Sequence, residues 1–320
     1  MNTIIDHQAH WFPRRYLDRL IGRTELPRVT HDSQGGYVLE VDAGVTQPKM
    51  AELSAGIDEH LEAASAAGVD KLVIGPATLG EVLHLPAGES ADLLDLLHVE
   101  YAAAQQAAPD RIAALAALPI QDPALALQVL DRAVVELGLK GVSLLTVNEG
   151  RPLVTDALME VYARIAELGV PLFLHPGLRS TTRGSAASLR AELGIGWMHQ
   201  TASAALELVD GGVLDELPQL VVVHPHLGGV LPYVAGRVSY FPTTAQHPLE
   251  HYLRTRFFTD TAAFTPGALK LALETYGEEH VLFASDHPFS SQTEMRQYVE
   301  RNTDARTATS IYTNRVPGLD

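Results

Sequence analysis

Four short polar motifs in this 320-residue chain contain side chains that bind metal ions or move protons, and each follows an apolar run. The motifs are Asp6-His7-Gln8-Ala9-His10, His175-Pro176-Gly177, His224-Pro225-His226 and Ser285-Asp286-His287. Two or three imidazoles and a carboxylate suit Zn²⁺, Mn²⁺ or Fe²⁺ and leave a coordination position for water or substrate. If the chain brings these motifs together, it forms a metal-dependent active site.

The apolar runs before the motifs are typical of β-strands, whose side chains alternate between two faces. Gln8 and His10 then share one face of the first strand, and we predict that they are a pair of metal ligands. The alternative is a polar cluster that caps the strand. His7 faces the other way and is expected to be packed, or to support a ligand, unless a bulge shifts the register.

Each later motif adds one predicted site residue. His175 stands where a strand meets its loop, and we expect it to be a ligand. His226 is predicted to be a catalytic base, acid or ligand. His224 could face the same side, but it lies deeper in the strand and is expected to be a buried, hydrogen-bonded histidine. A carboxylate after an apolar strand is costly to desolvate unless it meets a cation or donors, so Asp286 is predicted to be a metal ligand or proton donor.

Eight apolar runs alternate with amphipathic or alanine-rich segments along the whole chain. The expected strands are Thr3–His10, Lys71–Pro76, Ile112–Leu118, Lys140–Val147, Pro171–His175, Leu220–His226, Phe257–Thr261 and Val281–Asp286. The expected helices include Ile57–Ala67, Ala91–Ala107, Pro123–Leu137, Asp156–Leu168, Pro266–Tyr276 and Gln292–Arg301. This alternation predicts parallel strands joined by crossover helices, here an α/β fold of the (β/α)₈ TIM-barrel type. Only a closed barrel brings the four motifs to one mouth.

Two long segments are expected at that mouth, where the loops after the strands build active sites. Residues 14–50 are predicted to be an insertion after the first strand, with Gly36–Val41 as a small hairpin arm, and Ser180–Trp197 is predicted to be a long loop. Arg179, immediately before this second segment, Arg183 within it, and Arg237 are candidates for holding an anionic substrate group. No break in composition divides the chain, so residues 1–320 are expected to form a single domain.

Composition limits the classes of partner and compartment. The chain has 39 acidic and 23 basic residues and a formal net charge of −16, which argues against a nucleic acid or an anionic membrane as partner. The absence of cysteine excludes disulfides, thiolate nucleophiles and cysteine-based zinc sites. No apolar run approaches the ~18 residues that span a bilayer, and the first residues do not resemble a secretory signal. The cytoplasm is the expected location.

The whole set of motifs resembles the amidohydrolase superfamily, most closely its amidohydrolase-2 branch, which includes aminocarboxymuconate-semialdehyde decarboxylase and γ-resorcylate decarboxylase. The landmarks, in order, are Ile5–Pro13, Gly138–Val142, Phe173–Pro176, His226–Pro232, Gly236-Arg237 and Ser285–Phe289. The resemblance implies one divalent metal, Zn²⁺ or Mn²⁺. It places the family's ligands and catalytic groups on Gln8, His10, His175, His226 and Asp286.

The same resemblance implies a homodimer, because an arginine at the position of Arg237 can reach the partner's site in this family. The alternative for Arg237 is a salt bridge on a helix surface. Trp11 and Phe12 are candidates for an apolar wall against the substrate, with core packing as the alternative.

Two positions depart from the family pattern. Gln8 stands where the family has His or Glu, and a neutral amide oxygen is a poorer ligand, so we expect weaker metal binding or a metal held by three protein ligands. Asp58-Glu59-His60-Leu61-Glu62 contains no arginine, whereas the aminocarboxymuconate enzyme binds its substrate carboxylate with arginines on this helix. The same substrate is therefore not expected.

Three functions follow from these observations. The leading hypothesis is a non-oxidative decarboxylase acting on a small aromatic or unsaturated carboxylic acid. The second is a metal-dependent hydrolase of a lactone, ester or amide, which would use the same residues. The third is a metal-free or non-catalytic barrel that binds a small ligand, favoured by Gln8 and disfavoured by the four other polar site residues.

Overall fold

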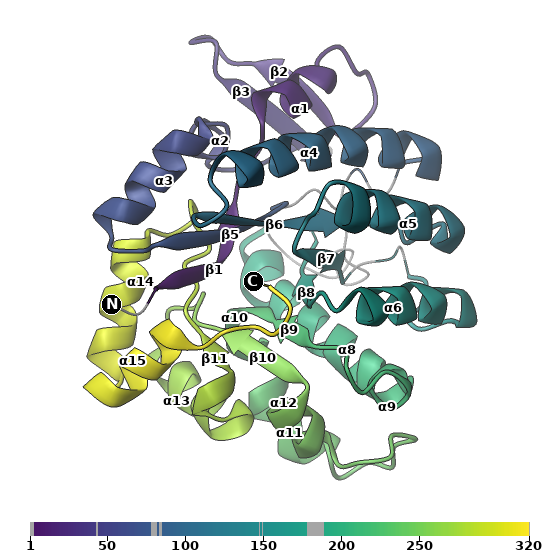
Figure 1. The fold of residues 1–320 in the computed structure, drawn as a ribbon, viewed down its shortest axis with the longest axis vertical. Helices are drawn as coiled ribbons and strands as arrows, with labels where there is room; N and C mark the ends of the chain where they lie inside the picture. Colours follow the sequence, from purple (N-terminus) through teal and green to yellow (C-terminus); the bar gives the residue numbers. More distant parts are fainter. Residues whose placement is uncertain are drawn as a thin grey trace.

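Eight parallel strands form a barrel surrounded by helices in the computed structural model (Figure 1). The structure describes residues 3–42, 44–77, 82, 85–146, 148, 150–177 and 189–319. The barrel strands, in spatial and chain order, are β1 (Ile5–His10), β5 (Lys71–Gly75), β6 (Ile112–Ala117), β7 (Gly141–Leu145), β8 (Leu172–His175), β9 (Val222–His224), β10 (Phe257–Asp260) and β11 (Val281–Leu282). The predicted fold class and strand order are confirmed.

Helices follow the strands and cover the outside of the barrel (Figure 1). They are α1 (Arg14–Arg19), α2 (Met50–Leu53), α3 (Ile57–Ala66), α4 (Ala87–Ala107), α5 (Pro123–Leu130) with the π-helical turn η2 (Asp131–Glu136), α6 (Asp156–Leu168), α7 (Leu189–Ala191) with the π-helical turn η4 (Glu192–Gly196), α8 (Trp197–Asp210), α9 (Val213–Glu216), α10 (Pro225–Gly228), α11 (Leu231–Val238), α12 (Leu249–Thr255), α13 (Pro266–Tyr276), the 3₁₀ turn η5 (Glu278–His280), α14 (Gln292–Asn302) and α15 (Ala305–Thr313).

Local sequence explains the ends of these helices, as in α6. The Thr155 side chain accepts a hydrogen bond from the Leu158 amide at the first turn, and Gly169 adopts a left-handed conformation with φ 68° at the last. In the part of the chain that the structure describes, no helix is both long and apolar enough to cross a membrane.

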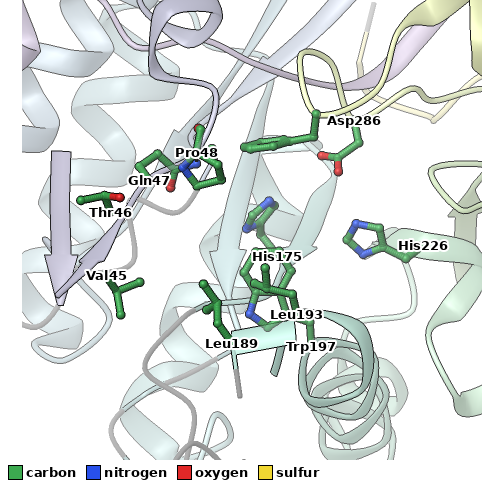
Figure 2. Close-up of a pocket in the computed structure, with 12 residues that line it drawn as sticks. Val45, Thr46, Gln47, Pro48, His175, Leu189, Leu193, Trp197, His226 and Asp286 are labelled. Carbon is green, nitrogen blue, oxygen red and sulfur yellow. Dashed lines mark hydrogen bonds between the residues drawn. The ribbon is translucent and has the colours of Figure 1, made fainter. Parts of the chain in front are cut away.

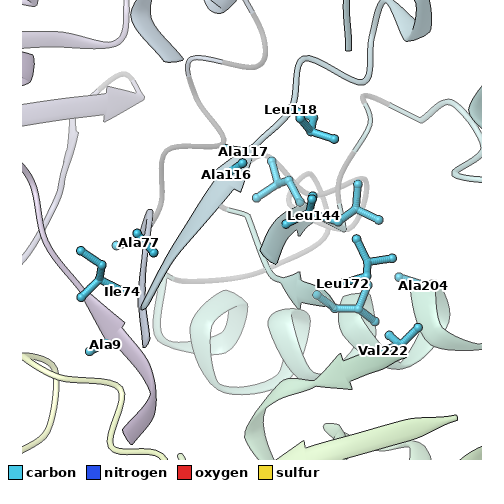
Figure 3. Packing of buried hydrophobic residues seen from close by; sticks show 14 of the residues in the cluster. Ala9, Ile74, Ala77, Ala116, Ala117, Leu118, Leu144, Leu172, Ala204 and Val222 are labelled. Atoms are coloured by element: carbon cyan, nitrogen blue, oxygen red, sulfur yellow. The ribbon is translucent and has the colours of Figure 1, made fainter. Parts of the chain in front are cut away.

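Side-chain alternation divides the core into an inner and an outer layer. Val73 belongs to a cluster inside the barrel, whereas its neighbours Leu72 and Ile74 pack in the larger cluster between strands and helices. Figure 3 shows this outer layer, in which Leu172 and Val222 lie near Ala204 of α8. Strands covered on both sides are apolar on both faces, which is why the sequence shows nearly continuous apolar runs.

Part of the chain between β1 and β5 forms a separate antiparallel sheet beside the barrel (Figure 1). Its strands are β2 (Arg28–His31), β3 (Tyr37–Asp42) and β4 (Val45–Thr46), paired in that order. A hairpin arm was predicted over Gly36–Val41. The structure places these residues mainly in the central strand of three. The two outer strands, around Arg28 and Val45, are too short to be recognised in the sequence.

The predicted loop Ser180–Trp197 is wrong in its second half. From Leu189 onward the chain is helical, through α7 and η4 into α8, and residues 178–188 lie outside the described residues. Leu189, Leu193 and Trp197 recur at four-residue spacing, a helical period that the glycines at 194 and 196 obscure.

The barrel closes between β1 and the chain after β11. Strand pairing in β11 covers only Val281–Leu282, so the predicted extension of this strand to Asp286 is wrong. The backbone still donates hydrogen bonds across this seam, from His7 to Phe283 (3.0 Å), from Asp286 to Gln8 (2.9 Å) and from His10 to His287 (2.8 Å). A bridge between Ala9 and His287 completes the closure.

A buried carboxylate fixes this seam from inside. Asp6 is fully buried, and its Oδ1 accepts hydrogen bonds from the Ser285 amide at 2.9 Å and the Gln8 amide at 3.3 Å. The Ser285 hydroxyl donates to Asp6 Oδ2 and accepts from the His287 amide. Burial raises the pKa of Asp6 to about 6. This network orders the residues on both sides of Asp286.

Buried histidines link stability to pH, and His98 of α4 is one of them. Its Nε2 accepts a hydrogen bond from the Ala117 amide at 3.0 Å, which requires the neutral ring, and burial lowers its pKa to about 4. A base whose pKa is lower in the folded state favours folding fully above its unfolded pKa of about 6.5 and less as pH falls toward 4.

We therefore expect His98→Gln, which retains an acceptor but does not titrate, to flatten the loss of stability between pH 6.5 and 4. The slope of the free energy of unfolding against pH should differ between the wild type and His98→Gln by at most about 1.4 kcal/mol per pH unit. Urea unfolding at several pH values measures it, with the exposed His199→Gln as the control. An unchanged slope in His98→Gln would show that His98 is not a neutral, buried group.

Candidate active site

A cavity of about 390 Å³ opens at the carboxyl ends of the barrel strands. Its wall comes from the end of the antiparallel sheet β2–β4 (the arm), the chain after β5, the helical segment after β8 and the chain after β11. The lining residues are Val45, Thr46, Gln47, Pro48, Ala77, His175, Leu189, Leu193, Trp197, His226, Asp286 and Phe289. Figure 2 shows His175, His226 and Asp286 directed toward a common space. A second space of about 20 Å³ also borders His175, together with Gln8 and His10, and is large enough for one water or a similar ion.

The structure brings all five predicted polar residues together. His10 Nε2 lies 3.0 Å from Asp286 Oδ1, and the two residues are 276 positions apart in the sequence. Gln8 Nε2 lies 3.3 Å from the same carboxylate oxygen and 3.5 Å from His226 Nε2. The rings of His10 and His175 meet edge to face with their centroids 5.1 Å apart.

Backbone carbonyls orient the imidazole rings of the two candidate metal ligands, His10 and His175. His10 Nδ1 lies 3.2 Å from the Gly75 carbonyl oxygen, and His175 Nδ1 lies 2.8 Å from the Pro176 carbonyl oxygen. A carbonyl oxygen only accepts hydrogen bonds, so each Nδ1 carries a proton and each Nε2 is directed into the site. Burial, with smaller effects of His10 and His226, holds the pKa of His175 well below its usual range, and His175 Nε2 therefore presents a lone pair.

His226 reaches the site from a turn, and the predicted extension of this strand to His226 is wrong. β9 ends at His224, and His226 and Leu227 adopt left-handed conformations with φ 57° and 56°. The His226 amide donates to Asp260 Oδ1 at 2.9 Å, which holds this turn against β10. A Cβ on Gly228 would lie 2.2 Å from the Tyr276 hydroxyl, so the turn packs only with glycine there.

Burial shifts the pKa values of both His226 and Asp260, whose carboxylate holds the His226 turn. The pKa of the His226 imidazole is lowered, chiefly by burial and against the attraction of Asp286. The pKa of Asp260 is raised to about 7, again chiefly by burial. A neutral imidazole beside a carboxylate offers a lone pair that can accept a proton and then return it.

Asp286 also stands in a left-handed conformation, with φ 59°. The seam hydrogen bonds of Ser285 and His287 fix its backbone on both sides, which directs the carboxylate toward His10. His287 points elsewhere, with its Nε2 3.1 Å from His60 Nδ1.

The remaining two histidines of the four motifs, His7 and His224, lie outside the cluster of Gln8, His10, His175, His226 and Asp286. His224 does not share a side with His226, because its Nδ1 lies 3.0 Å from the Tyr276 hydroxyl of α13. It is a buried, hydrogen-bonded residue, as expected for its depth in the strand. His7 Nδ1 lies 3.0 Å from the Phe283 carbonyl oxygen across the seam, and a register shift between Asp6 and Ala9 interrupts the alternation in β1.

The residues predicted to contact substrate are not among the described cavity lining. Trp11 lies in the core, where it stacks on Tyr101 and donates from Nε1 to the Ala55 carbonyl at 3.0 Å. Arg237 is exposed on α11, with its guanidinium 5.8 Å from the centre of the Phe241 ring. Arg179 and Arg183 lie outside the described residues.

Sequence reasoning missed most of the apolar wall. Nothing in the local pattern of Val45–Thr46 or of Leu193 and Trp197 points to a cavity, because their position depends on how distant segments pack. Asp260 was also missed, although it follows an apolar strand in the same way as Asp286. The rule that a buried carboxylate needs donors or a cation would have identified it.

The donor atoms at this mouth suit a divalent metal, although their present contacts are with one another. Among the described residues, no three His, Cys, Asp or Glu side chains are grouped as a metal site. The short contact between His10 Nε2 and Asp286 Oδ1 needs a proton on one atom or a cation between them. Gln8 Oε1 is buried without a hydrogen-bond partner among the described residues. Two imidazoles, a carboxylate and an amide oxygen match the ligand types of Zn²⁺ and Mn²⁺.

Comparison with known proteins identifies the family. The family model described as amidohydrolase matches residues 5–309. The decarboxylase orsB of Emericella nidulans is 29% identical over 256 residues, which cover 74% of this chain and 77% of that protein. The gamma-resorcylate decarboxylase of Polaromonas sp. is 30% identical over 258 residues, which cover 73% and 76%.

A solved structure shows the same fold. The dihydroxybenzoic acid decarboxylase from Polaromonas sp., with bound manganese and the inhibitor 2-nitroresorcinol, superposes with a TM-score of 0.77 at 20% identity, covering 98% of this chain and 95% of that one. The family indicated by the sequence motifs is therefore confirmed: this chain belongs to the amidohydrolase family.

Proposed function

We propose that this chain is a metal-dependent, non-oxidative decarboxylase that acts on a small aromatic or unsaturated carboxylic acid. The observation that carries the proposal is the meeting of Asp286 with His10, Gln8 and His226 at the polar end of an otherwise apolar cavity. Such a cavity accepts a planar hydrocarbon body and directs a carboxylate toward the polar end. The decarboxylases among its relatives support the same reaction class.

The metal would be held by His10, His175 and Asp286, with Gln8 Oε1 as a weaker fourth ligand. Zn²⁺ and Mn²⁺ both fit these donors, and the manganese in the Polaromonas decarboxylase favours Mn²⁺. When bound, a divalent ion supplies a Lewis acid that orients the substrate carboxylate and a neighbouring oxygen.

The protein's own groups handle the proton. In decarboxylation the bond between the ring carbon and the carboxylate breaks, CO₂ leaves, and the electron pair remains on the carbon, which then takes up a proton. Asp286 or His226 delivers this proton as a positioned general acid and is reprotonated from solvent. The apolar wall around Leu193, Trp197 and Phe289 keeps water from the reacting carbon.

The second candidate is hydrolysis of a lactone, ester or amide by a metal-activated water. His226 favours it, because a neutral imidazole with a lowered pKa accepts a proton from an attacking water. The third candidate, a metal-free barrel that binds a ligand, is favoured by the neutral Gln8.

The functions are separated by metal content and product. We expect about one Zn²⁺ or Mn²⁺ per chain after reconstitution, measured by plasma mass spectrometry, and CO₂ release from members of a panel of aromatic and unsaturated acids. A chelator should abolish the release. Ring opening of lactones without any CO₂ would favour the hydrolase, and failure to retain either ion would favour the metal-free barrel.

Asp286→Asn should reduce CO₂ release by a factor of about 10² to 10⁴, because the amide does not deliver a proton. Circular dichroism should show an unchanged fold, and metal content measured on the same sample separates a lost ligand from a lost proton donor. The exposed Asp58→Asn on α3 is the matched control. Near-normal turnover in Asp286→Asn would remove Asp286 as proton donor.

We also propose that the chain works as a homodimer through the surface around α11. Tyr233, Tyr240 and Phe241 are 85%, 85% and 56% exposed there, near Arg237. Large exposed aromatic side chains around an arginine are typical of subunit interfaces. Sedimentation velocity should show a dimer that Tyr233→Glu with Tyr240→Glu converts to monomer, whereas Phe264→Glu, at another exposed position, should not. A monomeric wild-type chain would contradict this proposal.

We further propose that residues 1–320 act as a single barrel domain, with residues 14–50 as an insertion at its mouth, and that the protein works in the cytoplasm. The contribution of Val45–Thr46 to the cavity wall supports the first point. The absence of cysteine is consistent with the second.

A further inference from the structure

The helical segment that walls the cavity carries a second row of residues, which are polar and buried. Leu189, Leu193 and Trp197 line the cavity. Glu192 and Gln200, two helical turns apart, are only 3% and 7% exposed and do not line it. Buried polar side chains are costly unless they are hydrogen-bonded, so this pair requires a structural or functional explanation.

Gln200 makes three hydrogen bonds that fix the orientation of its amide. Its Oε1 accepts from the Gly177 amide at 3.2 Å, and its Nε2 donates to the Gly177 carbonyl at 3.2 Å and to Glu192 Oε1 at 2.9 Å. Rotating the amide by 180° would place its NH₂ against the Gly177 N–H and its oxygen against a carboxylate. The observed orientation is therefore the only one that pairs donors with acceptors.

The bonded peptide leads directly to His175. The Gly177 N–H and the Pro176 carbonyl belong to the same peptide group, and that carbonyl oxygen lies 2.8 Å from His175 Nδ1. The hydrogen bonds thus run in one direction, from His175 Nδ1–H to Pro176, from Gly177 to Gln200, and from Gln200 to the Glu192 carboxylate. Aligned hydrogen bonds polarise one another, and an acceptor at Nδ1 raises the basicity of the other ring nitrogen.

We propose that Glu192 and Gln200 are positioning residues that hold the Pro176–Gly177 peptide and thereby keep His175 in the tautomer with the proton on Nδ1 and the lone pair on Nε2. The inference rests on the proposed function only in taking His175 as a metal ligand. These hydrogen bonds also connect the cavity wall to the proposed metal site, because α8 carries both Trp197 and Gln200.

The test uses protein labelled with ¹⁵N at histidine, without metal, in which two-bond ¹H–¹⁵N spectra report the tautomer of each ring. His175 is identified by the signal missing from His175→Gln. We expect the Nδ1–H tautomer in the wild type and a loss of that preference in Gln200→Met, which keeps the size but removes the hydrogen bonds. The Mn²⁺ affinity of Gln200→Met should fall by about 10- to 100-fold. Gln128→Met, the same change at an exposed site on α5, should alter neither quantity.

Glu192→Gln keeps an acceptor for Gln200 but removes the charge, so it should produce a smaller change in the same direction. It also decides the question if Gln200→Met does not fold. An unchanged His175 tautomer and an Mn²⁺ affinity within about twofold of wild type in the folded variants would overturn the proposal, even if their thermal stability fell. If the wild type binds no Mn²⁺, the proposed function fails, and the tautomer in metal-free protein still tests the positioning role.

Discussion

The closure of the barrel between β1 and residues 283–287 is the constraint on which the candidate site depends. Backbone hydrogen bonds across this seam and the buried Asp6 carboxylate, bound to Ser285, join the two ends of the sheet. Only this closure brings Gln8 and His10 to Asp286. A small shift at the seam would separate the carboxylate from the imidazole, because the contact between them is only 3.0 Å long.

The geometry of the site requires unfavourable local conformations that the rest of the fold maintains. Asp286, His226 and Leu227 are left-handed, and such conformations cost of order 1–3 kcal/mol each for residues other than glycine. The Asp6 and Asp260 carboxylates accept hydrogen bonds from the Ser285 and His226 amides and so hold the turns around Asp286 and His226. Strained residues held in this way are characteristic of active sites, where the direction of a side chain matters more than local stability.

Two segments outside the regular barrel complete the cavity. The antiparallel arm supplies Val45 and Thr46, and the helical segment after β8 supplies Leu193 and Trp197. The barrel strand ends and the turns that follow them therefore provide the histidines and the aspartate, whereas these added segments provide most of the apolar surface. Such a division lets loops and insertions change the substrate while the chemistry at the strand ends remains the same.

The sequence by itself determined the strand order, the (β/α)₈ architecture, the family and the five polar residues that meet at the mouth. Period-two and helical patterns are local, and a barrel brings every strand end to one face, so polar residues at those ends must converge. Tertiary structure alone decided that His226 points inward from a left-handed turn while His224 bonds to Tyr276, and that Trp11 lies in the core. It also decided the cavity wall and the contact of Gln200 with Gly177. These features depend on packing between segments far apart in the chain, which no local pattern encodes.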